Sequence, residues 1–193
     1  MRPLIRKHFI TPDEYLEFER SSPEKHEYFN GRIFDMAGAS LQHVRITSNI
    51  NISLGGQLKK RHCQSYQSDL RVHIPTTGLY TYPDVIVVCG KPRLLEDSYL
   101  DTLLNPDVIV VVLSPSTAEY EMNVKFDHYR KNESLKEYIL VWQDKKRVAR
   151  HTKRDDGSWI LSDFIGDDAL VDLSSIECSL SMDDIYDKVD FGE

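Results

Sequence analysis

The chain has 193 residues, of which 40% are hydrophobic and 28% are charged, as in an ordinary soluble globular protein. No apolar run approaches the roughly 20 residues that a membrane helix needs, and the N-terminus lacks the apolar core of a signal peptide. The net charge of −7 argues mildly against a protein that coats nucleic acid, but it allows an enzyme whose basic residues gather in one cleft.

The cysteines favour a reducing compartment. Cys63, Cys89 and Cys178 are odd in number and widely spaced, and none belongs to a CxxC motif that would indicate zinc. We therefore expect a cytoplasmic protein that does not contact membranes.

The N-terminal part carries strong local signals. Thr11-Pro12-Asp13-Glu14 combines a capping box with proline at the first helical position, which predicts a helix over residues 11–21. Asn30-Gly31 between two strand-like runs predicts a β-hairpin. Residues 40–61 then show a helical apolar pattern, although two adjacent glycines weaken its middle.

The middle of the chain reads mainly as strands. Residues 65–73 predict one strand, and the continuous apolar runs 83–89 and 108–113 predict strands that are buried on both faces. A helix is expected from Ser116 or Thr117 to about Asn132. Further strands are expected at 138–142, 148–152, 159–164 and 169–173, and Ser181 caps a last short helix within a C-terminal cap of residues 174–189. Basic runs at 59–62 and 145–147 read as a solvated helix end and a solvated hairpin turn.

This order predicts a single α/β domain over residues 1–193, with a central mixed β-sheet flanked by helices. It contains no internal repeat and no linker. The sequence has no glycine-rich phosphate loop, no Ser-His-Asp pattern and no HExxH motif. Their absence argues against an unrelated α/β enzyme.

Four side chains are candidates for chemistry. Asp84 stands at the mouth of a hydrophobic strand, where a carboxylate can bind a divalent ion, although Pro-Asp pairs usually mark turns. Lys125 shares a helix face with Tyr129 and would point at the same mouth if that helix packs beside the strand; otherwise it is a solvated lysine. Glu27 and His43 are further candidates, although a glutamate on an exposed strand face is normally only solvated and a lone histidine on a helix is more often structural than a ligand.

Several short motifs occur together and in order. They are Thr11-Pro12-Asp13-Glu14-Tyr15-Leu16, Lys25-His26-Glu27-Tyr28-Phe29-Asn30-Gly31, Thr81-Tyr82-Pro83-Asp84, Leu113-Ser114-Pro115-Ser116-Thr117 and Lys125-Phe126-Asp127-His128-Tyr129. In this arrangement the chain resembles the Uma family of restriction endonuclease-like proteins, abundant in cyanobacteria, from Thr11 to about Val189. The resemblance implies the restriction-endonuclease fold of the PD-(D/E)XK nucleases.

The resemblance also implies site residues. Asp84 matches the aspartate that holds Mg²⁺ or Mn²⁺, Lys125 a relocated catalytic lysine, Glu27 a second metal ligand and His43 the histidine of the family. It further implies a nucleic acid substrate, with DNA the first choice, and a homodimer by analogy with nucleases that cut both strands.

One position departs from the family pattern. The family's strand normally ends Glu-Val-Leu-Ser-Pro, and here the same place reads Val111-Val112-Leu113-Ser114-Pro115. Valine cannot bind a hard cation through its side chain, so Mg²⁺ binding should be weakened. Two hypotheses follow: a metal-dependent endonuclease whose catalysis is reduced or lost, and a catalytically inactive nuclease-fold protein that binds nucleic acid or a protein partner.

Overall fold

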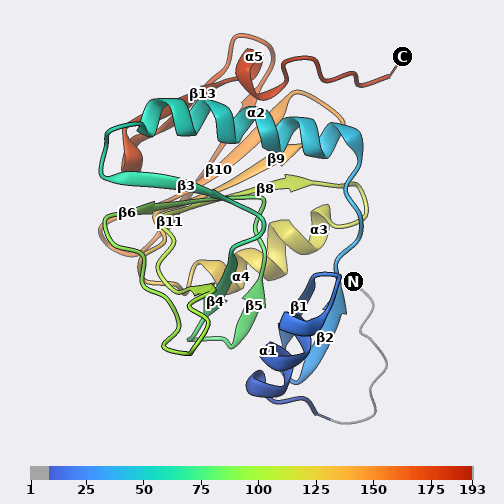
Figure 1. Ribbon diagram of the computed structural model, residues 1–193. Helices are drawn as coiled ribbons and strands as arrows, with labels where there is room; N and C mark the ends of the chain where they lie inside the picture. The colour runs from blue at the N-terminus through green and yellow to red at the C-terminus, as the bar shows by residue number, and fades with distance from the viewer. Residues whose placement is uncertain (1–8, 193) are drawn as a thin grey trace.

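A computed structural model describes residues 9–192, in which helices cover both faces of a twisted six-stranded sheet (Figure 1). Helix α2 (Leu41–Leu58) lies on one face, and a helical segment over residues 118–129 lies on the other. The expected α/β fold with a mixed sheet flanked by helices is confirmed. Among the residues described, no helix is both long and apolar enough to span a bilayer.

The six-stranded sheet has the order β11-β10-β9-β8-β6-β3, in which β8 and β9 are parallel and the other neighbours antiparallel. Its strands are β3 (Cys63–Gln67), β6 (Val85–Cys89), β8 (Val108–Leu113), β9 (Glu137–Trp142), β10 (Arg147–Lys153) and β11 (Trp159–Ile165). All six residues of β8 are buried, as their unbroken apolar sequence predicts.

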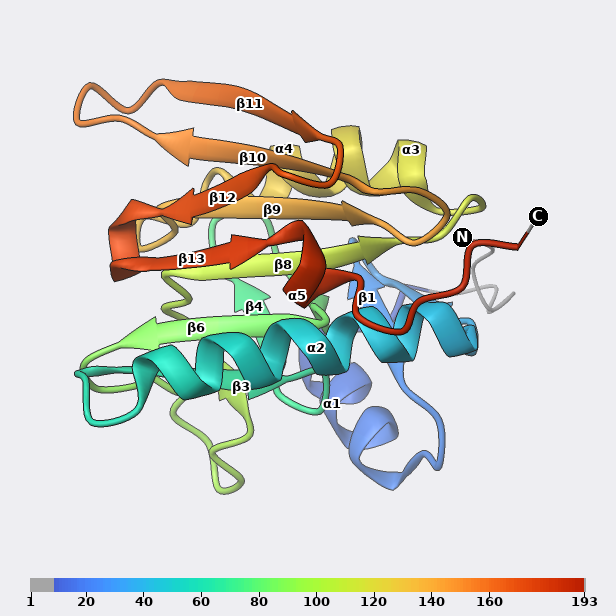
Figure 2. The ribbon, with the colours of Figure 1, turned by 90° about the horizontal axis from the view of Figure 1, so that it is seen from above.

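Alternation along β8 divides the core into two clusters. Val108, Val110 and Val112 pack with α2, whereas Ile109, Val111 and Leu113 pack with Tyr129 and other apolar side chains on the opposite face. Strands β12 (Leu170–Leu173) and β13 (Cys178–Ser181), with η2 (Ser174–Ile176) between them, form a two-stranded sheet that lies with α5 (Met182–Ile185) beside α2 (Figure 2).

A second, five-stranded sheet has the order β2-β1-β5-β4-β7. It consists of β1 (His26–Phe29), β2 (Arg32–Asp35), β4 (Arg71–Ile74), β5 (Leu79–Thr81) and β7 (Thr102–Leu103). The β1–β2 turn uses Asn30 and Gly31 with φ of 47° and 76°, the left-handed backbone for which this pair is suited. Helix α1 (Pro12–Ser21) has the expected capping box at Thr11 and packs against β1.

Two expectations about strands were wrong. The sequence predicted one central sheet, and the structure divides the strands among three. The run 65–73 is not one strand, because a turn closed by the Leu70 N–H to Gln67 C=O bond separates β3 from β4, which belong to different sheets. The short strands β5, β7 and β13 were not predicted.

The helix expected over residues 116–132 is shorter and irregular. It consists of α3 (Ala118–Tyr120), the π-helical turn η1 (Glu121–Lys125) and α4 (Phe126–Tyr129). A π-helical turn places one extra residue in the coil and often marks a functional site. Here the π-helical turn ends at Lys125, one of the four candidate residues selected from the sequence.

The cysteines also differ from expectation. Cys63 and Cys89 are paired across β3 and β6 and form a disulfide, while Cys178 is a buried free thiol. The two cysteines are direct cross-strand neighbours although 26 residues separate them in the sequence, so their spacing did not indicate the pairing.

Candidate active site

Asp84 lies immediately before β6 and is held by two hydrogen bonds. Its Oδ1 is 2.8 Å from Nε2 of His43, and its Oδ2 accepts a 2.7 Å bond from the N–H of Val112. His43 comes from the first turn of α2, whose N-cap is Ser40. The helix on one face and the neighbouring strand thus fix both oxygens of this partly exposed carboxylate.

Lys125 is a buried ion-pairing residue, not a solvated lysine. Its side chain is 6% exposed, and Nζ lies 2.7 Å from Oε1 of Glu27 and 2.8 Å from Oε1 of Glu121. Burial alone would lower the pKa of Lys125, but the two carboxylates outweigh it and hold the pKa well above its ordinary value. The ammonium therefore remains charged.

Glu27 comes from β1 and points to the face of the second sheet that meets this helical segment. Oε1 of Glu27 accepts a hydrogen bond from the Thr81 hydroxyl, which lies 3.2 Å from the hydroxyl of Tyr129. The Glu27 side chain is 2% exposed. The residue therefore belongs to the buried cluster and is not a solvated strand position.

The cluster carries more negative than positive charge. Glu27, Asp84 and Glu121 oppose the single ammonium of Lys125, and Oε2 of both Glu27 and Glu121 is buried without a hydrogen-bond partner. Burial raises the pKa of Glu121; Lys125 opposes this rise, whereas the charges of Glu27 and Asp84 add to it. The two unpartnered oxygens therefore leave buried negative charge without a hydrogen-bond donor or a second cation.

Val111, at the position where the resemblance implies a carboxylate, lies on β8 next to β6. The register Val85↔Val110 between β6 and β8 brings Val111 opposite Asp84 at the next step. The Val111 side chain is 5% exposed and packs in the same cluster as Tyr129. A glutamate at this position would therefore point to the face on which Lys125 lies.

The four side chains selected from the sequence form two contacting pairs. His43 contacts Asp84, and Glu27 contacts Lys125. Glu121 links them, because it contacts Lys125 directly and its charge interacts with that of Asp84. Sequence reasoning missed Glu121; the available signal was its position four residues before Lys125, which normally indicates only a surface ion pair.

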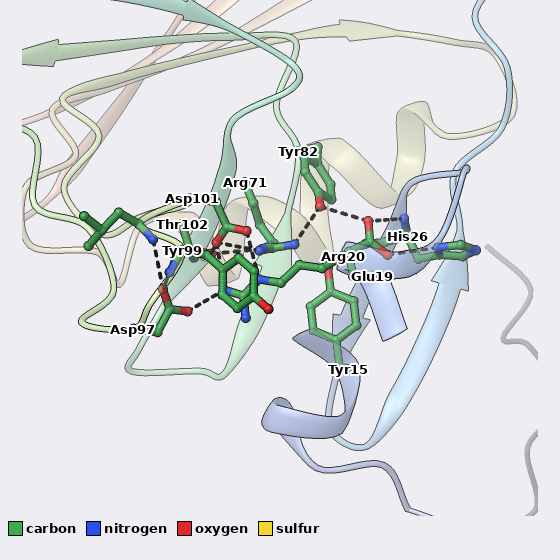
Figure 3. Close-up of polar contacts among 11 residues, drawn as sticks. Tyr15, Glu19, Arg20, His26, Arg71, Tyr82, Asp97, Tyr99, Asp101 and Thr102 are labelled. Carbon is green, nitrogen blue, oxygen red and sulfur yellow. Dashed lines mark hydrogen bonds and ion pairs between the residues drawn. The ribbon is translucent and has the colours of Figure 1, made fainter. Parts of the chain in front are cut away.

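A second polar network, also missed, joins α1 to residues beside the site in the chain (Figure 3). Glu19 of α1 accepts from the N–H of His26 and from the hydroxyl of Tyr82, each at 2.9 Å, and Tyr82 accepts from Arg71. His26 and Tyr82 directly adjoin Glu27 and Thr81 in the chain. The network therefore fixes the backbone next to Glu27 and next to Thr81, two residues whose side chains are hydrogen-bonded to each other.

Arg71 is the centre of this network and is 3% exposed. It donates to Thr102 and Tyr82 and forms a 2.8 Å ion pair with Asp101, which also accepts from Arg20 (Figure 3). Burial raises the pKa of Asp101, but Arg20 and Arg71 overcome that effect and hold the pKa well below its ordinary value.

The family model described as "Putative restriction endonuclease", Uma2, matches residues 12–183. The chain belongs to the Uma2 family. Among its relatives are two proteins of Synechocystis sp., slr1290, 37% identical over 92% of this chain and 91% of that protein, and sll1609, 36% identical over 86% and 93%. The family resemblance and the cyanobacterial relatives expected from the motifs are thus confirmed for this Uma2 protein.

A solved structure from Anabaena variabilis shares the fold of this Uma2 chain. It is described as a "putative nuclease belonging to DUF820" and superposes with a TM-score of 0.75 at 23% identity, covering 92% of this chain and 97% of that one. At this identity the likeness establishes the nuclease-type fold and not the reaction.

Proposed function

We propose that this Uma2 protein is a metal-dependent endonuclease of the PD-(D/E)XK type whose activity is reduced because Val111 replaces a metal-binding glutamate. The observation that carries the proposal is the buried pairing of Lys125 with Glu27 and Glu121, with the partly exposed Asp84 near enough for its charge to act on Glu121, on a nuclease fold. The pKa values of Glu121 and Lys125 are both raised, and neighbouring groups with perturbed pKa values are typical of functional sites.

The oxygen donors that remain match the ligand chemistry of Mg²⁺ or Mn²⁺. In the structure the ligand atoms of Asp84, Glu27 and Glu121 do not all lie within 4.8 Å of one another, so binding requires the glutamates to turn away from Lys125. Asp84 and Glu27 would hold the ion, as the sequence suggested, and the structure adds Glu121; the unpartnered Oε2 atoms of the two glutamates are hard oxygen donors that the protein leaves unused. When bound, such an ion lowers the pKa of a water ligand and stabilises charge developing on a phosphate.

The side chains of the protein have separate tasks. His43 and the Val112 N–H orient Asp84. Lys125 carries a proton at Nζ and provides positive charge for the phosphodiester or the attacking water once Glu27 or Glu121 turns to the metal. In the structure Lys125 instead pairs with Oε1 of both glutamates, so ammonium and metal compete for the same two carboxylates.

That competition and the missing carboxylate both act against metal binding. Mg²⁺ relies on few protein carboxylates, and replacing one by an apolar side chain removes a direct ligand. We infer a weak metal site and slow or absent cleavage, with DNA as the first substrate to test.

The second candidate function is a catalytically inactive scaffold that binds nucleic acid or a protein partner. Val111 favours it, because its buried apolar side chain packs into the core and offers no oxygen to a metal ion or to a water ligand. The acidic net charge of −7 favours a protein partner over nucleic acid.

Cleavage of supercoiled and linear DNA with Mg²⁺ or Mn²⁺ tests these candidates. The wild-type chain, Val111→Glu and the double variant Val111→Glu/Asp84→Asn would be compared at equal concentration. We expect Val111→Glu to cut faster than the wild type and the double variant to be inactive. Absence of cleavage by Val111→Glu, despite restored metal binding, would favour the scaffold; equal activity of wild type and Val111→Glu would show that Val111 is not a lost ligand.

A further inference from the structure

A second cluster of possible metal ligands lies at the opposite end of β6 from Asp84. One ligand atom each of His62, Cys63 and Cys89 lies within 4.8 Å of the others, and these three form a group with metal-ligand chemistry within residues 9–192. Cys63 is buried, Cys89 is partly exposed and His62 is exposed. The cluster is therefore accessible from solvent on one side.

The ladder explains why the two sulfurs meet. Cys63 and Cys89 are Cα partners in the antiparallel β3–β6 pair. The N–H of Cys89 donates to Oδ2 of Asp107 at 2.7 Å, on the β8 side, so it points away from β3. Cys63 and Cys89 hence form a non-hydrogen-bonded pair, the kind in which opposing side chains lie closest.

The backbone around His62 is also fixed. The C=O of His62 accepts a 2.8 Å bond from the N–H of Gly90, and Arg61 next to it donates through its guanidinium to the C=O of Glu177 at 2.8 Å. The first bond holds the end of β6 to the start of β3, and the second holds the residue before His62 to the turn before β13, whether or not the sulfurs are bonded. A hollow of about 400 Å³ beside Cys63, bordered by Leu58 and Lys59, opens this region to small solutes.

We propose that Cys63, Cys89 and His62 form a redox-controlled site for a soft divalent cation such as Zn²⁺. In the oxidised protein the sulfurs are joined in a disulfide and cannot bind the ion. In the reduced protein, two thiolates and one imidazole provide the Cys₂His donor set of zinc sites, and the fourth position remains open to solvent.

The redox step balances with a dithiol as the reductant. A thiolate of the dithiol attacks Sγ of Cys89, the more exposed sulfur; the S–S bond breaks, and its electron pair passes to Sγ of Cys63. The second thiol of the reductant then displaces Cys89 from the mixed disulfide, giving two protein thiols and an oxidised dithiol. Zn²⁺ binding releases the two thiol protons to solvent.

The test is a Zn²⁺ titration of the full chain in its oxidised form and after reduction with a phosphine that is then removed. A competing chromophoric chelator reports affinity, and Co²⁺ provides thiolate-to-metal charge-transfer absorption as a spectroscopic signature. We expect one ion per reduced chain and none at this site in the oxidised chain.

Variants locate the ion. Cys89→Ser should lower the charge-transfer absorption to that of a single thiolate or less, and His62→Asn should weaken Zn²⁺ binding by at least about tenfold, because loss of even an outer-shell partner costs that much. Cys178→Ala, which removes the third thiol, and Lys59→Gln, an exposed neighbour, serve as controls and should bind Zn²⁺ like the wild type.

His62 is exposed, so its replacement should leave the fold intact, as circular dichroism can verify. A reduced chain that does not bind Zn²⁺, or reduced wild type and His62→Asn with equal affinity, would overturn the proposal. So would binding by the oxidised chain that depends on His62.

Discussion

The main-chain N–H of Val112 donates a 2.7 Å hydrogen bond to Oδ2 of Asp84, which places the neighbouring Val111 directly beside the carboxylate across β8 and β6. The backbone thus presents position 111 next to Asp84, as a shared metal site requires. What the chain lacks there is the side-chain oxygen.

Restoring that oxygen should strengthen metal binding. We expect Val111→Glu to bind Mn²⁺ and Mg²⁺ at least about tenfold more tightly than the wild type, because a hard cation gains a direct carboxylate ligand. Calorimetric titration measures the affinities. Val111→Gln, similar in size but uncharged, is the matched control and should gain little; equal affinities for all three proteins would contradict this account of the site.

Removing the ammonium of Lys125 should destabilise the fold. Lys125→Met leaves Glu27 and Glu121 facing one another in a buried site, and we expect the free energy of unfolding to fall by about 3–5 kcal/mol. Denaturant unfolding measures this loss. Adding Glu121→Gln to Lys125→Met should recover part of it, and Mn²⁺ should stabilise Lys125→Met more than the wild type; a double variant less stable than Lys125→Met would contradict the charge argument.

The buried guanidinium of Arg71 should matter for stability far more than a surface one. Arg71→Met removes the partner of Asp101 and the donors to Thr102 and Tyr82, and we expect a loss of about 3 kcal/mol. Arg61→Met, an exposed arginine with one bond to a backbone C=O, should cost less than about 1 kcal/mol. Similar losses for both variants would argue against the network.

Asp101 should make the protein sensitive to acid. Its pKa in the folded state is depressed below the unfolded value, so its contribution to stability is present above the unfolded pKa and is lost as the pH falls towards the folded one. Thermal unfolding followed from pH 7 to pH 3 should show a steeper loss of stability for the wild type than for Asp101→Asn. Parallel pH profiles would assign the acid sensitivity to other carboxylates.

The sequence correctly predicted those helices, strands and turns that depend on a few adjacent residues. The capping box at Thr11, the Asn30-Gly31 turn and the unbroken apolar runs of β6 and β8 each fix an element through a few adjacent residues. The turn between β3 and β4 contains Ser68 and Asp69 but neither glycine nor proline, so it was read as part of one strand.

The site could be predicted only in part, because its decisive properties are tertiary. Asp84, Lys125, Glu27 and His43 came from motif matches, but nothing in the sequence shows that Lys125 is buried between two glutamates. Glu121 looks like half of a surface ion pair until the second sheet packs over it. The contact of Cys63 with Cys89 likewise depends on strand register across 26 residues.

The π-helical turn η1 makes the geometry of this site sensitive to chain length. Because a π-helical turn accommodates one extra residue, a deletion that converts η1 to regular α-helix would change the spacing of Glu121 and Lys125 from four residues to three and so alter the direction of one side chain relative to the other. Substitutions at the exposed positions Asn123 and Val124 should be tolerated, whereas loss of either residue should not. We therefore expect the Glu121–Lys125 ion pair to be shared only with relatives that have neither an insertion nor a deletion in η1.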